Sequence, residues 1–139
     1  MFKVIIWATD GSNGAEKALP FAKNLVKASG ARLIVVNVNE FMAGRGAGPV
    51  IVNQDQVQAE IGNQVAALKQ EGLDAKLQLA EVVAGGAAHV ITEVADKEGA
   101  DLIVTGTRGH GHLAGLLVGS VTNRLLHIAK CPVLVVPSR

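Results

Sequence analysis

The stretch that decides the fold is "ADLIVTGTRGHGHLAGLLVGS", residues 100–120. It begins as a short apolar run, continues with five glycines between residues 106 and 119, and leads into "SVTNRLLHIAK", which has helical spacing. This order is typical of a buried strand, a glycine-rich connection and a helix. Each glycine loses more conformational entropy on ordering than another residue would. We therefore expect that the connection requires unusual backbone angles or a bare backbone.

Strand-like and helical patterns alternate along the rest of the chain. The expected strands cover residues 2–9, 32–39, 74–83, 100–106 and 131–137. Helical spacing fills the intervals, and the first helix is expected to have Ser12 or Asn13 as its N-cap, to bend at Pro20 and to end at Gly30. The third strand is partly polar, which suits the edge of a sheet. This alternation predicts an α/β fold in one domain, residues 1–139, with a mainly parallel sheet, helices on both faces and right-handed crossovers.

The composition excludes several classes of protein. The chain has 139 residues, of which 49% are hydrophobic and 18% charged, so it is not a disordered chain. A net charge of +1 gives no electrostatic footprint for nucleic acid or an anionic membrane. No apolar run reaches the roughly 18 residues of a membrane span, and we expect no signal peptide. With Cys131 as its one cysteine, the chain is expected to be cytoplasmic.

The glycine-rich connection has the features of a phosphate site. Ser120 is expected at or near a helix N-terminus, where unpaired N–H groups and the helix dipole attract anions. Gly106, Gly109 and Gly119 would let the backbone approach anionic oxygens without a side chain in the way. Arg108 would add positive charge. The same glycines could instead serve packing alone, and the sequence leaves both readings open.

The first strand ends at Asp10, which could complete this site. Open parallel sheets bind ligands at the carboxyl ends of their strands, where the strand order reverses. If the first and fourth strands are neighbours, Asp10 and Gly106 face one crevice. A carboxylate repels phosphates unless a cation intervenes, so Asp10 suggests Mg²⁺. Taken alone, Asp10 is more typical of a residue that caps the first helix.

Other motifs are absent or have ordinary explanations. There is no G-x-x-x-x-G-K-[ST] and no G-x-G-x-x-G after the first strand, so neither a P-loop nor a dinucleotide site is indicated. His110 and His112 form an H-x-H pair without a nearby cysteine or carboxylate, which does not favour a metal site. His89 and His127 are expected to be structural, and Cys131 to be a packed thiol. No set of nucleophile, base and acid is evident.

The spaced motif is the basis of a family resemblance. Residues 106–120 fit the pattern G-x-x-G, nine residues, then G-[ST], and the first turn, "ATDGSNGAEKAL", and the ending, "CPVLVVP", match as well. Over essentially its whole length the chain resembles a single-domain universal stress protein of the ATP-binding type. The resemblance implies an adenine nucleotide α-hydrolase-like fold, with five parallel strands in the order 3-2-1-4-5.

The resemblance also implies site residues and partners. ATP and Mg²⁺ would be the ligands, with Asp10 near the metal and the phosphates and Val38 against adenine. The last strand, Val133–Val136, would pair with a second copy in a homodimer, which would cover an exposed edge. The full set of implied nucleotide contacts is Ala8, Thr9, Asp10, Val38, Gly106, Arg108, Gly109, Gly119, Ser120 and Val121.

The leading hypothesis is therefore a cytoplasmic ATP-binding stress-response regulatory protein that is read by a protein partner not identified by the sequence. One alternative is a slow ATPase or phosphotransferase in which His110 or Asp10 orients water, although no clamp of the usual kind is evident. Another is a dimeric interaction module that binds no nucleotide. An ATP pyrophosphatase would have an S-G-G-x-D-S-like first loop, which "TDGSNGA" lacks. Residues 41–52 vary within the family, and their role stays open.

Overall fold

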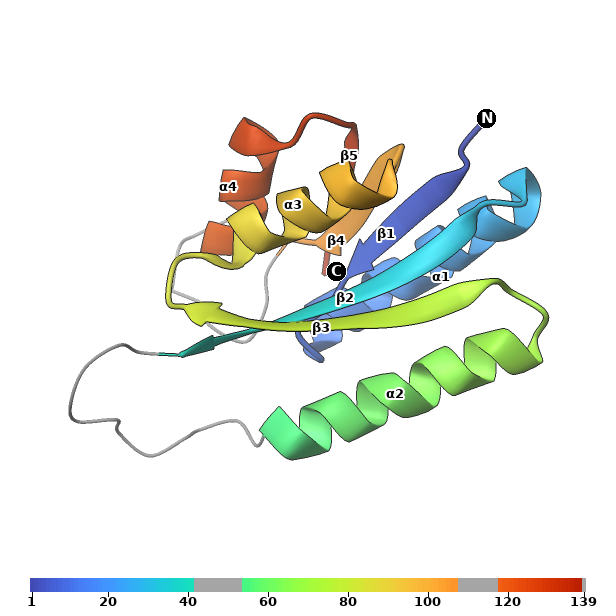
Figure 1. Ribbon diagram of the computed structural model, residues 1–139, viewed down its shortest axis with the longest axis horizontal. Helices are drawn as coiled ribbons and strands as arrows, with labels where there is room; N and C mark the ends of the chain where they lie inside the picture. The colour runs from blue at the N-terminus through green and yellow to red at the C-terminus, as the bar shows by residue number, and fades with distance from the viewer. Residues whose placement is uncertain (42–53, 108–117, 139) are drawn as a thin grey trace.

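The computed structural model describes residues 1–41, 54–107 and 118–138. Strands and helices alternate in the predicted way (Figure 1). Their bounds are β1 Val4–Ala8, α1 Asn13–Ser29, β2 Arg32–Phe41, α2 Gln54–Gln70, β3 Ala75–Val83, α3 Ala87–Glu98, β4 Leu102–Gly106, α4 Ser120–Ile128 and β5 Val133–Val136.

The five strands form one sheet in the order β3-β2-β1-β4-β5, and every neighbouring pair is parallel. This confirms the predicted α/β fold class and strand order. β3 lies at one edge, as its partial polarity predicted, and β5 lies at the other. Because β1 lies between β2 and β4, the strand order reverses there, and the carboxyl ends of β1 and β4 are neighbours.

Each face of the sheet is covered by one pair of helices. Figure 1 shows α3 and α4 on one side and α2 on the other, with α1 behind the sheet. The alternation along each strand sends successive side chains to opposite faces. On β1, Ile5 and Trp7 pack with α1 and α2, whereas Ile6 and Ala8 pack with α3 and α4. The central strands are thus buried on both sides, which explains why they are apolar without interruption.

Local signals explain how α1 begins and ends. The Ser12 side chain accepts a hydrogen bond from the N–H of Ala15, and Gly30 ends the helix in the left-handed conformation. α1 continues through Pro20 to Ser29, so the proline does not end the helix. The prediction of Ser12 as one of two candidate caps is confirmed.

β2 is longer than the sequence predicts. It extends past Asn39 to Phe41, because its last residues pair with β3, up to Phe41 opposite Val83. A loop was expected at residues 41–52, but Phe41 is the last residue of β2. The rest of that segment lies outside the described residues. The extra residues bring Glu40 into the sheet, where it lies opposite Val82 of β3.

Candidate functional site

A cavity of about 260 Å³ lies at the carboxyl ends of the central strands. The ends of β1, β2 and β4 form its floor, and the first turns of α3 and α4 form part of its walls. This is the crevice that the switch in strand order predicts. The cavity lies in the layer between α3 and α4, whose N-termini both contribute lining residues.

The expected contact residues that the structure describes all line this cavity. They are Ala8, Thr9, Asp10, Val38, Gly106, Gly119, Ser120 and Val121. Arg108 and Gly109 lie outside the described residues, as do His110 and His112. The open question of whether Asp10 and Gly106 share a crevice is thus answered by the neighbouring positions of β1 and β4.

In the turn after β1, side chains accept hydrogen bonds from backbone N–H groups two residues further along the chain. The N–H of Ser12 donates to Oδ1 of Asp10 at 2.9 Å, and the N–H of Gly11 donates to Oγ1 of Thr9 at 3.1 Å. Asp10 therefore shapes the turn, while Ser12 caps α1. Gly11 has a φ of +82°, and a Cβ added there would lie 2.8 Å from a Val57 methyl group, so both conformation and space require glycine.

Asn37 ties β2 to this turn. Its side chain is 1% exposed, and its amide nitrogen donates to the carbonyl oxygen of Thr9 at 2.9 Å. The N–H of Thr9 in turn donates to the carbonyl oxygen of Val36. These bonds fix the end of β1 against β2, and therefore the place of Asp10 at the cavity. This role of Asn37 could not be predicted, because an asparagine within an apolar strand gives no local sign of its partner.

The end of β4 packs directly on α1. A Cβ added to Gly106 would lie 2.4 Å from the carbonyl oxygen of Gly14, which no real Cβ tolerates. Glycine is therefore required at position 106 because α1 lies directly against it. The same residue lines the cavity. Of the two explanations that the sequence left open, packing is shown at this residue.

The N-terminus of α4 faces the cavity without a capping side chain. Gly119 is the N-cap residue, in an extended conformation, and no acidic residue lies in the first turn. The first N–H groups of a helix have no partner within the helix. Gly119 itself is fixed by a hydrogen bond of 2.6 Å from its N–H to the carbonyl oxygen of Thr107. This arrangement favours an anion at Ser120 and Val121.

Glu40 is a lining residue of the cavity that was not among the expected site residues. Glu40, near the end of β2, lines it, and Oε2 of Glu40 accepts the N–H groups of Gly85 and Ala87 at 2.7 and 3.2 Å. Among the described lining residues, Asp10 and Glu40 are the only charged ones. The sequence pattern of this strand ends at Asn39, so it gives no sign that Glu40 shares a strand face with Val36 and Val38.

Cys131 lies away from this cavity and behaves as a packed thiol. It contacts the core on the α3 and α4 side of the sheet. Burial raises the pKa of the Cys131 thiol, and the nearby Asp96 carboxylate raises it further. The thiol therefore stays protonated near neutral pH, which does not suit a nucleophile.

A family model described as the universal stress protein family matches residues 1–137. The chain belongs to the universal stress protein family. A universal stress protein of Thermus aquaticus is 36% identical over 136 residues, which cover 98% of this chain and 99% of that protein. None of the described helices is long and apolar enough to cross a membrane.

Solved structures of universal stress proteins resemble the fold. The MJ0577 protein of Methanocaldococcus jannaschii superposes with a TM-score of 0.76 at 25% identity, over 99% of this chain and 96% of that one. A universal stress protein solved in complex with cAMP superposes with a TM-score of 0.73 at 25% identity, over 99% of both chains.

Proposed function

We propose that this universal stress protein is a stress-response regulatory protein of the cytoplasm that binds ATP in the cavity between α3 and α4. The observation that carries the proposal is the uncapped N-terminus of α4, which faces a cavity whose opposite walls are apolar. A ligand with an anionic end and a flat apolar end suits both parts. The cAMP complex of a relative with the same fold supports an adenine nucleotide.

The phosphates would lie at the start of α4. Ser120 and Val121 would offer backbone N–H groups beside the bare backbone of Gly119, and the Ser120 hydroxyl would donate a further hydrogen bond. Arg108 and Gly109, which precede α4 in the chain, would add charge and a bare backbone. The adenine would lie toward Val38, near the end of β2.

Asp10 fits a magnesium ion in this arrangement. It lines the cavity on the turn after β1, and Mg²⁺ in nucleotide sites is commonly held by one or two carboxylates together with phosphate oxygens. A carboxylate can accept a backbone N–H, as Asp10 does from Ser12, and also bind a cation. The ion would neutralise the charge of the phosphates, and Asp10 would hold them at the end of β1.

The lining favours binding over turnover. The charged side chains of the described lining residues are carboxylates, so these residues do not supply the cationic clamp that phosphoryl transfer uses. We therefore propose that ATP acts as a signal. It would bind between the turn after β1 and the connection before α4, and a protein partner would recognise the nucleotide-bound surface.

We also propose a homodimer through β5. Val133, Leu134 and Val135 are half-buried on an edge strand, and such an apolar edge invites association unless it is covered. A second copy pairing along Val133–Val136 would cover it.

The site can be tested at Gly119. Its extended backbone accepts any residue, so Gly119→Val is expected to fold while its side chain obstructs the α4 N-terminus. Gly62→Val on α2 is the matched control, because a Cβ there meets no atom within 4 Å. We expect Gly119→Val to weaken ATP binding at least tenfold and Gly62→Val to leave it unchanged, measured by calorimetry. Normal ATP affinity in a folded Gly119→Val protein would refute this site, and an interaction module without nucleotide would then be favoured.

A further inference from the structure

β3 forms one edge of the sheet, and no described strand pairs with its outer side. Its nine residues pair with β2 in an uninterrupted register from Ala75 to Val83, so the strand has no bulge, and it contains no proline. β5, at the other edge, has four residues and lies between Pro132 and Pro137. Figure 1 shows β3 between α3 and α2, with its outer edge toward the viewer. Natural sheets commonly protect an edge with short strands, prolines or bulges, and β3 has none of these features.

Alternate residues of β3 turn their backbone groups toward this open edge. The carbonyl oxygen of Asp74 accepts from the N–H of Leu33, and the N–H of Ala84 donates to the carbonyl oxygen of Phe41. Because the backbone groups of successive residues in a strand point to opposite sides, the even-numbered residues of β3 are the ones that bond to β2. The N–H groups of the odd-numbered residues therefore point outward, and no described residue accepts a hydrogen bond from them. The odd-numbered residues are Ala75, Leu77, Leu79, Glu81 and Val83.

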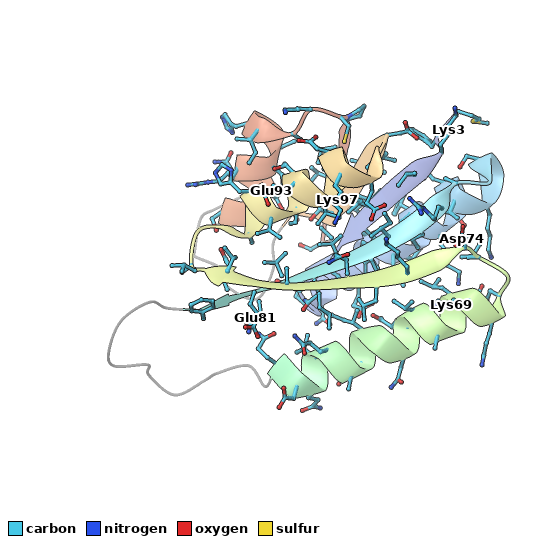
Figure 2. All side chains as sticks on the ribbon, in the orientation of Figure 1. Lys3, Lys69, Asp74, Glu81, Glu93 and Lys97 are labelled. Carbon is cyan, nitrogen blue, oxygen red and sulfur yellow. The ribbon has the colours of Figure 1, made fainter. Side chains whose placement is uncertain are left out.

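Some of these residues also present an apolar surface that contains one charge. Leu77 packs into the core on the α2 side of the sheet, so the side chains two, four and six residues later point to that side as well. Of these, Leu79 and Val83 are 42% and 46% exposed, and Phe41, opposite Val83 on β2, is 46% exposed. Figure 2 shows the side chain of Glu81 on the side of the sheet that faces α2. Three exposed apolar side chains thus accompany one carboxylate along a row of unpaired N–H groups.

A second copy of this chain fits the edge poorly. Lys76 is the only basic residue of β3, and it points to the opposite side of the sheet, where its Nζ lies 2.7 Å from Oε1 of Glu98 on α3. In an antiparallel pair, residues directly opposite each other share a face, so Glu81 could not lie opposite Lys76 of a second copy. Self-pairing at β3 in addition to the proposed pairing at β5 would also give an open fibre rather than a closed dimer. The surface therefore suits a different chain, one that supplies its own cation.

We propose that β3 is a docking edge for an extended segment of a partner protein, which adds a strand to the sheet. The segment would bond to the outward backbone groups of β3. Its side chains on the α2 side would be apolar beside Leu79 and Val83, and a lysine or arginine would lie beside Glu81. In this mode of recognition, main-chain hydrogen bonds supply affinity and alternate side chains supply specificity. The inference does not depend on nucleotide binding.

A palindromic peptide is the probe for this edge, because it has the same sequence in both strand directions. It has valine at its first, third, seventh and ninth positions, lysine at the fifth, and threonine at the positions between. Its lysine can pair with Glu81 while the neighbouring valines pair with Leu79 and Val83. A second peptide has glutamate in place of the lysine. A third carries N-methyl groups on its five central residues, which removes their hydrogen-bond donors.

The experiment measures the dissociation constants of the labelled peptides for the native chain, Glu81→Lys and Glu93→Lys by fluorescence anisotropy. Glu93 is exposed on α3 and provides the matched control for the change in charge. We expect the native chain and Glu93→Lys to prefer the lysine peptide to the glutamate peptide, and the ratio of the two constants to shift about tenfold toward the glutamate peptide in Glu81→Lys. The inference would be overturned by an unchanged ratio in Glu81→Lys, by equal binding of the N-methylated peptide, or by no saturable binding of the lysine peptide up to about 1 mM.

Hydrogen exchange of the native chain gives a second measurement that needs no variant. Without peptide, the amides of Leu77, Leu79 and Glu81 are expected to exchange faster than those of Gln78 and Ala80, which bond to β2. Saturation with the lysine peptide should slow exchange of the outward amides about tenfold or more. Unchanged exchange of these amides would overturn β3 as the docking edge. Slow exchange in the peptide-free chain that depends on protein concentration would show a second copy at this edge and overturn the choice of partner.

Discussion

The hydroxyl group of Thr122 donates a hydrogen bond of 2.7 Å to the carbonyl oxygen of Gly106, and so joins the first turn of α4 to the end of β4. Thr122 is 5% exposed, so the bond lies away from water. It connects the glycine that ends the strand to the helix whose N-terminus faces the cavity. The position of the proposed phosphate site therefore depends on this contact.

Replacing Thr122 by valine tests this connection. The change keeps the shape of the side chain and leaves the buried carbonyl oxygen of Gly106 without its donor. We expect Thr122→Val to lower the free energy of unfolding by about 1–3 kcal/mol and to weaken ATP binding, as measured by denaturant titration and calorimetry. Thr92→Val is the control, because the Thr92 hydroxyl donates only to the carbonyl oxygen of His89 within α3. Equal stability of the two variants would contradict the role of Thr122.

Replacing glycine by alanine is expected to change the free energy of unfolding in opposite directions at Gly106 and at Gly62. In Gly106→Ala the new Cβ would lie 2.4 Å from the carbonyl oxygen of Gly14, and the shift of α1 should lower the free energy of unfolding by about 1–3 kcal/mol or more. In Gly62→Ala the Cβ meets no atom within 4 Å, and the higher helix propensity of alanine should raise stability by up to about 1 kcal/mol. Thermal melting of both variants measures the difference. A Gly106→Ala protein as stable as the native chain would show that β4 does not approach α1 so closely.

Much of this fold follows from local sequence signals, and the exceptions depend on distant contacts. Ser12 could be predicted as a cap because its partner, Ala15, lies three residues away. Glu40 could not be assigned, because its partners Gly85 and Ala87 are reached only when β2 pairs with β3 up to Phe41. The sequence pattern of the second strand ends at Asn39 and therefore leaves Glu40 in a loop.

The candidate site also combines features that local sequence signals predict with features that depend on distant contacts. The glycine spacing and the acidic first turn indicated where the cavity would form, because parallel strands bring their carboxyl ends to one edge. The sequence left open whether Gly106 serves packing or access, since that depends on the distance to Gly14 of α1. Thr122 was missed because a threonine in the first turn of a helix is common and its bond to Gly106 spans 16 residues.

The ionised carboxylate of Asp101 is expected to stabilise the fold, so that the free energy of unfolding decreases in acid. The N–H groups of Lys3 and Val4 donate to its carboxylate, and they hold the pKa of Asp101 below its ordinary value. Because the folded chain binds the proton less readily than the unfolded chain, the carboxylate contributes stability above the unfolded pKa of about 3.9. That contribution is lost as the pH falls through the lower pKa of the folded state.

Asp101→Asn should therefore be less stable than the native chain at neutral pH and should lose less stability on acidification below about pH 4. Denaturant titrations at several pH values measure both effects. Asp74→Asn, at an exposed position between α2 and β3, serves as the control. An identical acid dependence in Asp101→Asn and the native chain would contradict the assignment.

If two copies pair through β5, a charged side chain on that strand should separate them and reduce the mass of the assembly to that of a monomer. Val135 is half-buried on this edge strand, and Val135→Lys should prevent a second copy from pairing with it. Val83→Lys places the same charge on the opposite edge, at the exposed end of β3, and should leave the assembly unchanged. Analytical ultracentrifugation is expected to give a dimer for the native chain and Val83→Lys and a monomer for Val135→Lys. A native chain that sediments as a monomer at micromolar concentration would contradict the proposed dimer.

The most direct test of the account is a calorimetric titration of the nucleotide-free protein with ATP, with and without Mg²⁺. We expect saturable binding with micromolar affinity, which corresponds to about −8 kcal/mol, and tighter binding with Mg²⁺. At a hundredfold excess over the dissociation constant ATP should add about 2.7 kcal/mol to the stability of the fold and raise its melting temperature by several degrees. No binding at millimolar ATP would contradict the account, because the α4 N-terminus and the Asp10 turn would then serve the fold or a different ligand.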